Sequence, residues 1–136
     1  MPDARTDERD QINIPFSADH RTTGFTTHTE SLMKSLTNAV AAFLRDIVRI
    51  PSLSGHEARV VKRIAARMRG LHIYDKVWID ALGNVIGQWG RGPRKIMFDA
   101  HVDTVDVGDR AQWPFDPYAA TLRHGRIYGR GAVDEK

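Results

Sequence analysis

The chain has 136 residues, of which 41% are apolar and 27% charged, with a formal net charge of +3 at pH 7. This length and composition fit one ordinary globular domain, and the weak, dispersed positive charge lacks the basic–aromatic motif of a nucleic-acid-binding protein. The chain contains no cysteine, which excludes disulfides, thiolate metal sites and a cysteine nucleophile, so any metal must be held by His, Asp or Glu.

Residues 1–29 are polar, mixed in charge and without periodicity, which predicts a flexible leader. They hold no apolar core of a secretory signal, and no apolar run in the chain approaches the ~18 residues of a membrane span. We therefore expect a cytoplasmic protein with no membrane partner. From Leu32 to Val48 apolar residues recur in steps of three and four, which predicts a helix ended by Pro51.

A second helix is predicted from about Ser54 to Gly70. Ser54 and Glu57 have the spacing of a capping box, in which each side chain would satisfy a free backbone N–H of the first turn. Gly70 is a plausible C-terminal stop. The predicted buried side consists of Val61, Ile64, Ala65 and Met68.

The spacing of apolar residues then changes to two, which is typical of strands. Strands are predicted at residues 77–79, 85–89, 96–98, 121–123 and 126–128. Gly83 and Asn84 form a turn between the first two strands, and His124 and Gly125 form one between the last two. The strand at 96–98 is expected to be buried on both faces. This order of elements predicts an α/β domain with a mixed sheet.

His101 and Asp103 follow the predicted strand at 96–98, and ligands gather at such strand ends in open α/β sheets. Residues two apart on an extended chain point to the same side. His101 could bind zinc through one ring nitrogen while Asp103 accepts a hydrogen bond from the other. A purely structural hydrogen bond between the two residues would explain the short motif equally well.

Asp134 follows Gly129 and Gly131, which permit tight backbone close to a site. A carboxylate has two oxygens, so one Asp can bridge two metal ions ~3.5–4 Å apart. The alternative is an ordinary glycine turn that carries a solvated Asp.

These segments combine into one pattern with fixed spacings. It runs His101-x-Asp103-x-Val105, then Trp113-x-x-Asp116-Pro117, then Gly125-x-x-Tyr128-Gly129-Arg130-Gly131-x-x-Asp134-x-Lys136. The pattern resembles the zinc exopeptidase and deacylase superfamily, which includes acetylornithine deacetylase, succinyl-diaminopimelate desuccinylase, aminoacylase and glutamate carboxypeptidase. The resemblance covers roughly residues 40–136, and the run from Arg45 to Asp134 is similar to the branch of selenium-metabolism-linked hydrolases.

The resemblance implies that residues 30–136 form the N-terminal portion of a zinc-exopeptidase-like catalytic domain. His101 would bind one of two zinc ions, Asp134 would bridge both, and Asp103 would orient the site as a catalytic residue. Co²⁺ or Mn²⁺ could replace Zn²⁺ at such ligands. The implied reaction is hydrolysis of an amide in a small N-acyl amino acid or peptide, and the full-length family member can be a homodimer. The bond from Asp134 to Glu135 is a candidate for a cis peptide.

The family completes its site with a Glu general base, further acidic ligands and a distant His, which we expect beyond Asp134. We therefore expect a truncated, inactive and marginally folded polypeptide, with open sheet edges and exposed apolar surface. The alternative is a non-catalytic remnant, or a module that binds a partner through its unfinished sheet.

Overall fold

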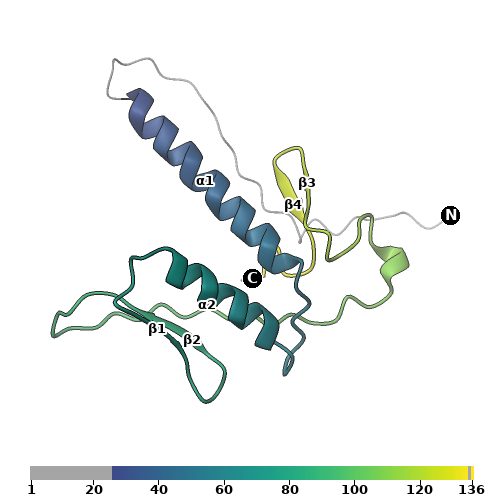
Figure 1. The fold of residues 1–136 in the computed structure, drawn as a ribbon. Coiled ribbons are helices and arrows are strands. Elements are labelled where there is room, and N and C mark those ends of the chain that lie inside the picture. The colour runs from purple at the N-terminus through teal and green to yellow at the C-terminus, as the bar shows by residue number, and fades with distance from the viewer. Residues whose placement is uncertain (1–25, 135) are drawn as a thin grey trace.

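The computed structural model describes residues 26–134 and residue 136, and most of the expected leader therefore lies outside the described residues. Two helices precede two small antiparallel sheets (Figure 1). The helices are α1 (Thr26–Val48) and α2 (Ala58–Gly70). The paired strands are β1 (Lys76–Ile79) with β2 (Val85–Gln88), and β3 (Thr121–Arg123) with β4 (Arg126–Tyr128). These elements confirm the α/β class.

Helix α1 ends at Val48, as expected from Pro51, because the residue before a proline is pushed out of the helical region. At its other end the helix includes Thr26–Thr29, which the sequence had assigned to the leader. Neither α1 nor α2, the α-helices of the described part, combines the length and apolarity needed to cross a membrane.

The predicted capping box of α2 is wrong. Glu57 occupies the cap position, but its side chain makes no cap hydrogen bond to the helix and instead accepts one from the Gly55 amide at 2.6 Å. The Ser54 hydroxyl donates to the Asp103 carboxylate at 2.5 Å. The helix begins at Ala58 with Glu57 at its cap position, so Ser54 lies three residues before the cap, where its hydroxyl does not satisfy the first-turn amides.

Both predicted hairpins are present. In the turn between β1 and β2, the Asp80 carboxylate accepts from the Leu82 and Asn84 amides at 3.0 and 2.9 Å, and Gly83 supplies a φ of +95°. Helix α2 lies across this hairpin (Figure 1). A short 3-10 helix, η2 (Arg110–Gln112), interrupts the long loop before β3.

The predicted strand at residues 96–98 is wrong. These residues form no strand, and Phe98 is 95% exposed. A strand is stable only where a neighbour pairs with its backbone, and among the described residues no strand lies beside this segment. The expected single mixed sheet is accordingly replaced by two separate hairpins and one isolated parallel bridge between Leu53 and Thr104.

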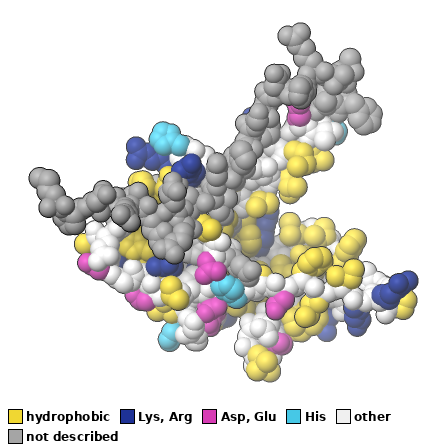
Figure 2. All heavy atoms as spheres, turned by 180° about the vertical axis from the view of Figure 1, so that it is seen from behind, with side chains coloured by type: hydrophobic (Ala, Val, Ile, Leu, Met, Phe, Trp, Pro, Cys, Tyr) yellow, Lys and Arg dark blue, Asp and Glu magenta, His cyan; other side chains and the backbone are white. Residues whose placement is uncertain are grey.

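The main core lies where the C-terminal half of α1 meets the β3–β4 hairpin. It consists of Val48, Ala120, Ile127 and Ala132. Arg45 of α1 adds a hydrogen bond from its Nε to the Ala120 carbonyl at 2.9 Å. The N-terminal half of α1 projects away from this core (Figure 1), and hydrophobic side chains lie open on the projecting helix and around the β1–β2 hairpin (Figure 2).

Candidate metal centre

The connection between α1 and α2, residues 49–57, holds the segment 101–104 by its backbone. The Thr104 amide donates to the Ser52 carbonyl, and the fully buried Ser52 hydroxyl donates to the Val102 carbonyl, both at 2.8 Å. Leu53 and Thr104 form the parallel bridge between the two segments. These contacts fix the chain on both sides of Asp103.

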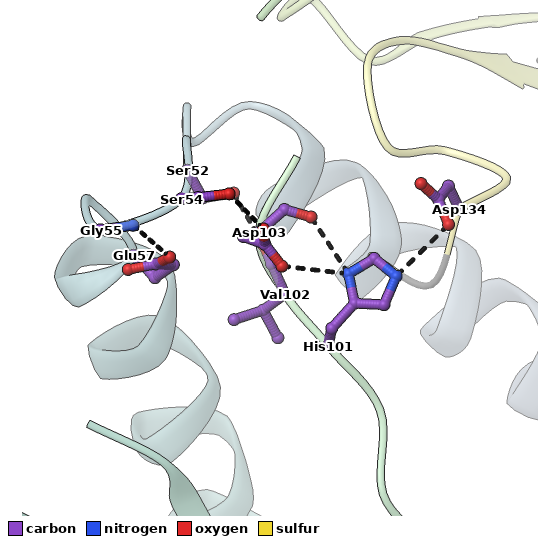
Figure 3. A network of polar contacts seen from close by, with 8 residues as sticks. All are labelled: Ser52, Ser54, Gly55, Glu57, His101, Val102, Asp103 and Asp134. Carbon is purple, nitrogen blue, oxygen red and sulfur yellow. Dashed lines mark hydrogen bonds and ion pairs between the residues drawn. The ribbon is translucent and has the colours of Figure 1, made fainter. Parts of the chain in front are cut away.

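His101 lies between two carboxylates (Figure 3). Its Nδ1 is 3.3 Å from Asp103 Oδ1 and 3.2 Å from the Asp103 carbonyl oxygen, and its Nε2 is 3.3 Å from Asp134 Oδ1. The neighbours of both ring nitrogens are oxygens that can only accept a hydrogen bond. A metal ion at Nε2 would require the hydrogen of the neutral ring to be on Nδ1, where Asp103 can accept it.

The Asp103 carboxylate is divided between two partners. Oδ1 faces His101, and Oδ2 accepts the hydrogen bond from Ser54. The Ser54 hydroxyl, helped by the nearby His101 imidazole, holds the pKa of Asp103 below its usual range. Asp103 is therefore ionised at neutral pH and remains an acceptor for Nδ1–H.

Asp134 lies in a turn whose backbone is held by close packing at Gly131 and by hydrogen bonds from Lys136. The Gly131 backbone has a φ of +82°, and a Cβ at that position would meet Thr104 and Lys136. The Lys136 amide donates to the Asp134 carbonyl at 2.9 Å, and the Lys136 ammonium donates to the Ile50 carbonyl. The predicted cis bond after Asp134 involves Glu135, which lies outside the described residues.

The separation of the ligand atoms fits a zinc ion in part. Two ligand atoms about 2.0–2.1 Å from a tetrahedral zinc ion lie about 3.3–3.4 Å apart, and the distance from His101 Nε2 to Asp134 Oδ1 is 3.3 Å. Asp103 at the opposite ring nitrogen matches the carboxylate–histidine–metal arrangement. Within residues 26–134 and 136, however, no group of three or more metal-binding side chains is assembled.

A cavity of about 520 Å³ adjoins the same segment, between α2 and the β1–β2 turn. Asp99, His101 and Asp103 lie on one of its walls, and Lys62 lies on another. The aromatic residues of the motif do not line it. Trp113 donates from its indole to the Val107 carbonyl and packs under Arg130, and the Phe115 ring packs on Tyr128.

Sequence reasoning missed the contribution of Ser54 to this cluster. Its spacing to Glu57 indicated a helix cap, and its actual partner is 49 residues away in the chain. No local pattern predicts such a contact. Lys136 was recognised only as the last residue of the motif, and its link to Ile50 spans 86 residues.

Comparison with known proteins agrees with the motif. Residues 97–136 match the model of peptidase family M20/M25/M40. This match covers 40 of the 136 residues. It is 49% identical over 94 residues to the protein YgeY of Escherichia coli K12, an alignment that covers 69% of this chain and 23% of that protein.

Two further relatives carry the name succinyl-diaminopimelate desuccinylase. The protein of Methylocella silvestris is 34% identical over 110 residues, covering 76% of this chain and 28% of the relative. That of Dinoroseobacter shibae is 35% identical over 98 residues, covering 70% and 26%. The chain thus spans about a quarter of the length of the curated relatives it matches. No solved structure matches it.

Proposed function

We propose that this chain supplies part of the active site of a metal-dependent hydrolase that cleaves amide bonds in N-acyl amino acids or small peptides. The observation that carries the proposal is His101, with Asp103 at one ring nitrogen and Asp134 at a zinc-compatible distance from the other. The relationship to the M20/M25/M40 peptidases, and to proteins named desuccinylases, supports the same reaction class.

In this proposal His101 and Asp134 are metal ligands. Zinc is the ion their chemistry suits, with Co²⁺ and Mn²⁺ as alternatives. A bound ion would activate the amide carbonyl and a water molecule as a Lewis acid. Asp103 keeps the hydrogen on Nδ1 of His101, so that Nε2 stays available as a ligand. Asp134 has a second oxygen with which it could contact a second ion.

We further propose that residues 30–136 belong to one catalytic domain of a cytoplasmic protein with a small-molecule substrate and no nucleic-acid or membrane partner, and that the full-length protein is a homodimer. By themselves the described residues provide two ligands, whereas catalytic zinc normally has three from the protein. The chain alone should therefore bind an ion weakly and leave amides intact.

Zinc titration of the purified chain tests the ligand pair. Asp134→Ala should weaken zinc binding by at least the about 10–100-fold that the loss of an outer-shell partner costs, and Glu30→Ala, which removes an exposed carboxylate on α1, should leave it unchanged. Hydrolysis of N-acetyl and N-succinyl amino acids should stay at background with zinc present. Equal zinc affinity in all three proteins would refute the ligand pair, and turnover by the chain alone would refute the need for further ligands.

A second candidate function is a non-catalytic module that binds a partner protein. The exposure of Ile96, Met97 and Phe98, at 85%, 86% and 95%, favours it. It predicts the absence of specific zinc binding in the same titration.

A further inference from the structure

The Asp103 carboxylate contacts His101 with only one of its two oxygens, beside the Asp103 backbone carbonyl oxygen. If the carboxylate rotated about its χ2 torsion, Oδ1 would leave Nδ1 and the imidazole would lose its charged acceptor. Terminal torsions of Asp are broad, so backbone geometry alone does not fix this rotation. The hydrogen bond from Ser54 to Oδ2 opposes this rotation and has the largest effect on the pKa of the Asp103 carboxylate (Figure 3).

The backbone around Asp103 is held independently of Ser54. Ser52 binds the chain before and after Asp103 through the Val102 carbonyl and the Thr104 amide. Helix α2 also begins without a cap from the Ser54 side chain. Removal of the Ser54 hydroxyl should consequently change the side-chain orientation at Asp103 while the fold persists.

We propose that Ser54 is a positioning residue, whose hydroxyl fixes the rotation of the Asp103 carboxylate and thereby the orientation and tautomer of His101. The inference rests on the proposed function and deepens it, because it adds Ser54 as a fourth member to the chain of contacts that leads from Asp134 through His101 to Asp103. It assigns to the connection before α2 a role at the metal ligands rather than in capping the helix.

Three variants distinguish the effect of the Ser54 hydroxyl on His101 from an effect on the stability of the fold. Ser54→Ala deletes the donor, Ser54→Thr retains it, and Ser35→Ala deletes an exposed serine hydroxyl on α1. The first readout is the pair of ¹⁵N shifts of the His101 imidazole in metal-free protein, assigned with His101→Gln. The second is zinc affinity. Circular dichroism confirms that each variant is folded.

We expect Ser54→Ala to move the ¹⁵N shifts of His101 toward those of a mixture of tautomers. We also expect it to weaken zinc binding by about threefold to tenfold, which is less than the loss expected when a direct partner of a ligand is removed. Ser54→Thr and Ser35→Ala should match the parent. Identical ¹⁵N shifts in Ser54→Ala and the parent would overturn the proposal.

The imidazole readout needs no metal, so the two proposals can fail separately. If zinc affinity is insensitive to Asp134→Ala but the His101 shifts respond to Ser54→Ala, the ligand pair is wrong and Ser54 still positions His101. If zinc affinity falls in Asp134→Ala while the His101 shifts are the same in Ser54→Ala and the parent, the ligand pair is supported and the role proposed for Ser54 is wrong.

Discussion

Lys136 is a cationic side chain that the fold places out of solvent. Lys136 lies at the end of the turn that carries Asp134, and only 8% of the residue is exposed. Its ammonium group donates to the Ile50 carbonyl, in the connection between the helices. Burial disfavours the charged form and lowers the pKa of Lys136 to about 8, from 10.5 in the unfolded chain. The protonated side chain is thus less favourable in the native state than in the unfolded one.

The pH dependence of stability follows from this difference. Between pH 8 and pH 10.5 the unfolded chain binds the proton more fully than the native chain, so the free energy of unfolding should rise with pH across this window. Since one pKa unit corresponds to about 1.4 kcal/mol, the rise is at most about 3.5 kcal/mol. Urea denaturation at a series of pH values measures it. Lys136→Met should remove the rise and Lys62→Met, at an exposed position, should keep it; the same slope in both variants would contradict the assignment.

At the scale of elements, the packing of α1 on the β3–β4 hairpin depends on a close approach at Gly129. A Cβ at Gly129 would lie 2.5 Å from Val48 Cγ1 and 3.0 Å from the Pro117 carbonyl oxygen. Val48 is fully buried and the Pro117 oxygen is backbone, so neither can move without disturbing the main core.

Gly129→Ala should therefore lower the free energy of unfolding by about 1–3 kcal/mol, the usual cost of overpacking. Gly92→Ala is the matched control, because its nearest neighbour would be the Arg94 carbonyl oxygen at 3.9 Å; its effect should stay within about 0.5 kcal/mol. Thermal or chemical denaturation compares the two. Equal stability of both variants would mean that α1 and the hairpin are not packed as described.

The elements that sequence predicted correctly are those whose cause is local. Periodicity indicated both helices and both hairpins, with Pro51 and Gly83 near their boundaries. The strand at 96–98 failed because a strand depends on a neighbour that sequence does not specify. The capping box failed because α2 begins later than the spacing suggested, with Glu57 and not Ser54 at its cap position. At the site, the spacing of His101 and Asp103 correctly suggested a contact, whereas the approach of Asp134 to His101 required the fold.

On the scale of the whole molecule, large apolar side chains remain open to solvent, and two groups of them are adjacent in sequence. Leu32, Leu36 and Val40 lie on the projecting half of α1 and are 56–62% exposed, and residues 96–98 are more exposed still. Apolar surface of this kind promotes association. The chain should therefore form dimers or larger species as its concentration rises.

Sedimentation velocity over a concentration series measures this association. Leu36→Lys combined with Phe98→Ser should shift the distribution toward monomer, whereas Glu30→Ala combined with Lys34→Ala changes exposed polar positions on the same helix and should have little effect. A parent chain that stays monomeric throughout would show that these surfaces do not drive self-association.

The connection between the helices contacts both sides of the proposed ligand pair, through Ser52 on the side of His101 and through Ile50 on the side of Asp134. A hinge motion at the α1–α2 junction would consequently change the separation of the two ligands. Because coupling free energies are reciprocal, an ion that joined His101 to Asp134 would also stiffen that junction. Amide hydrogens from Ile50 to Ser54 would then exchange more slowly with solvent when the ion is bound, although none of them is close to a ligand in sequence.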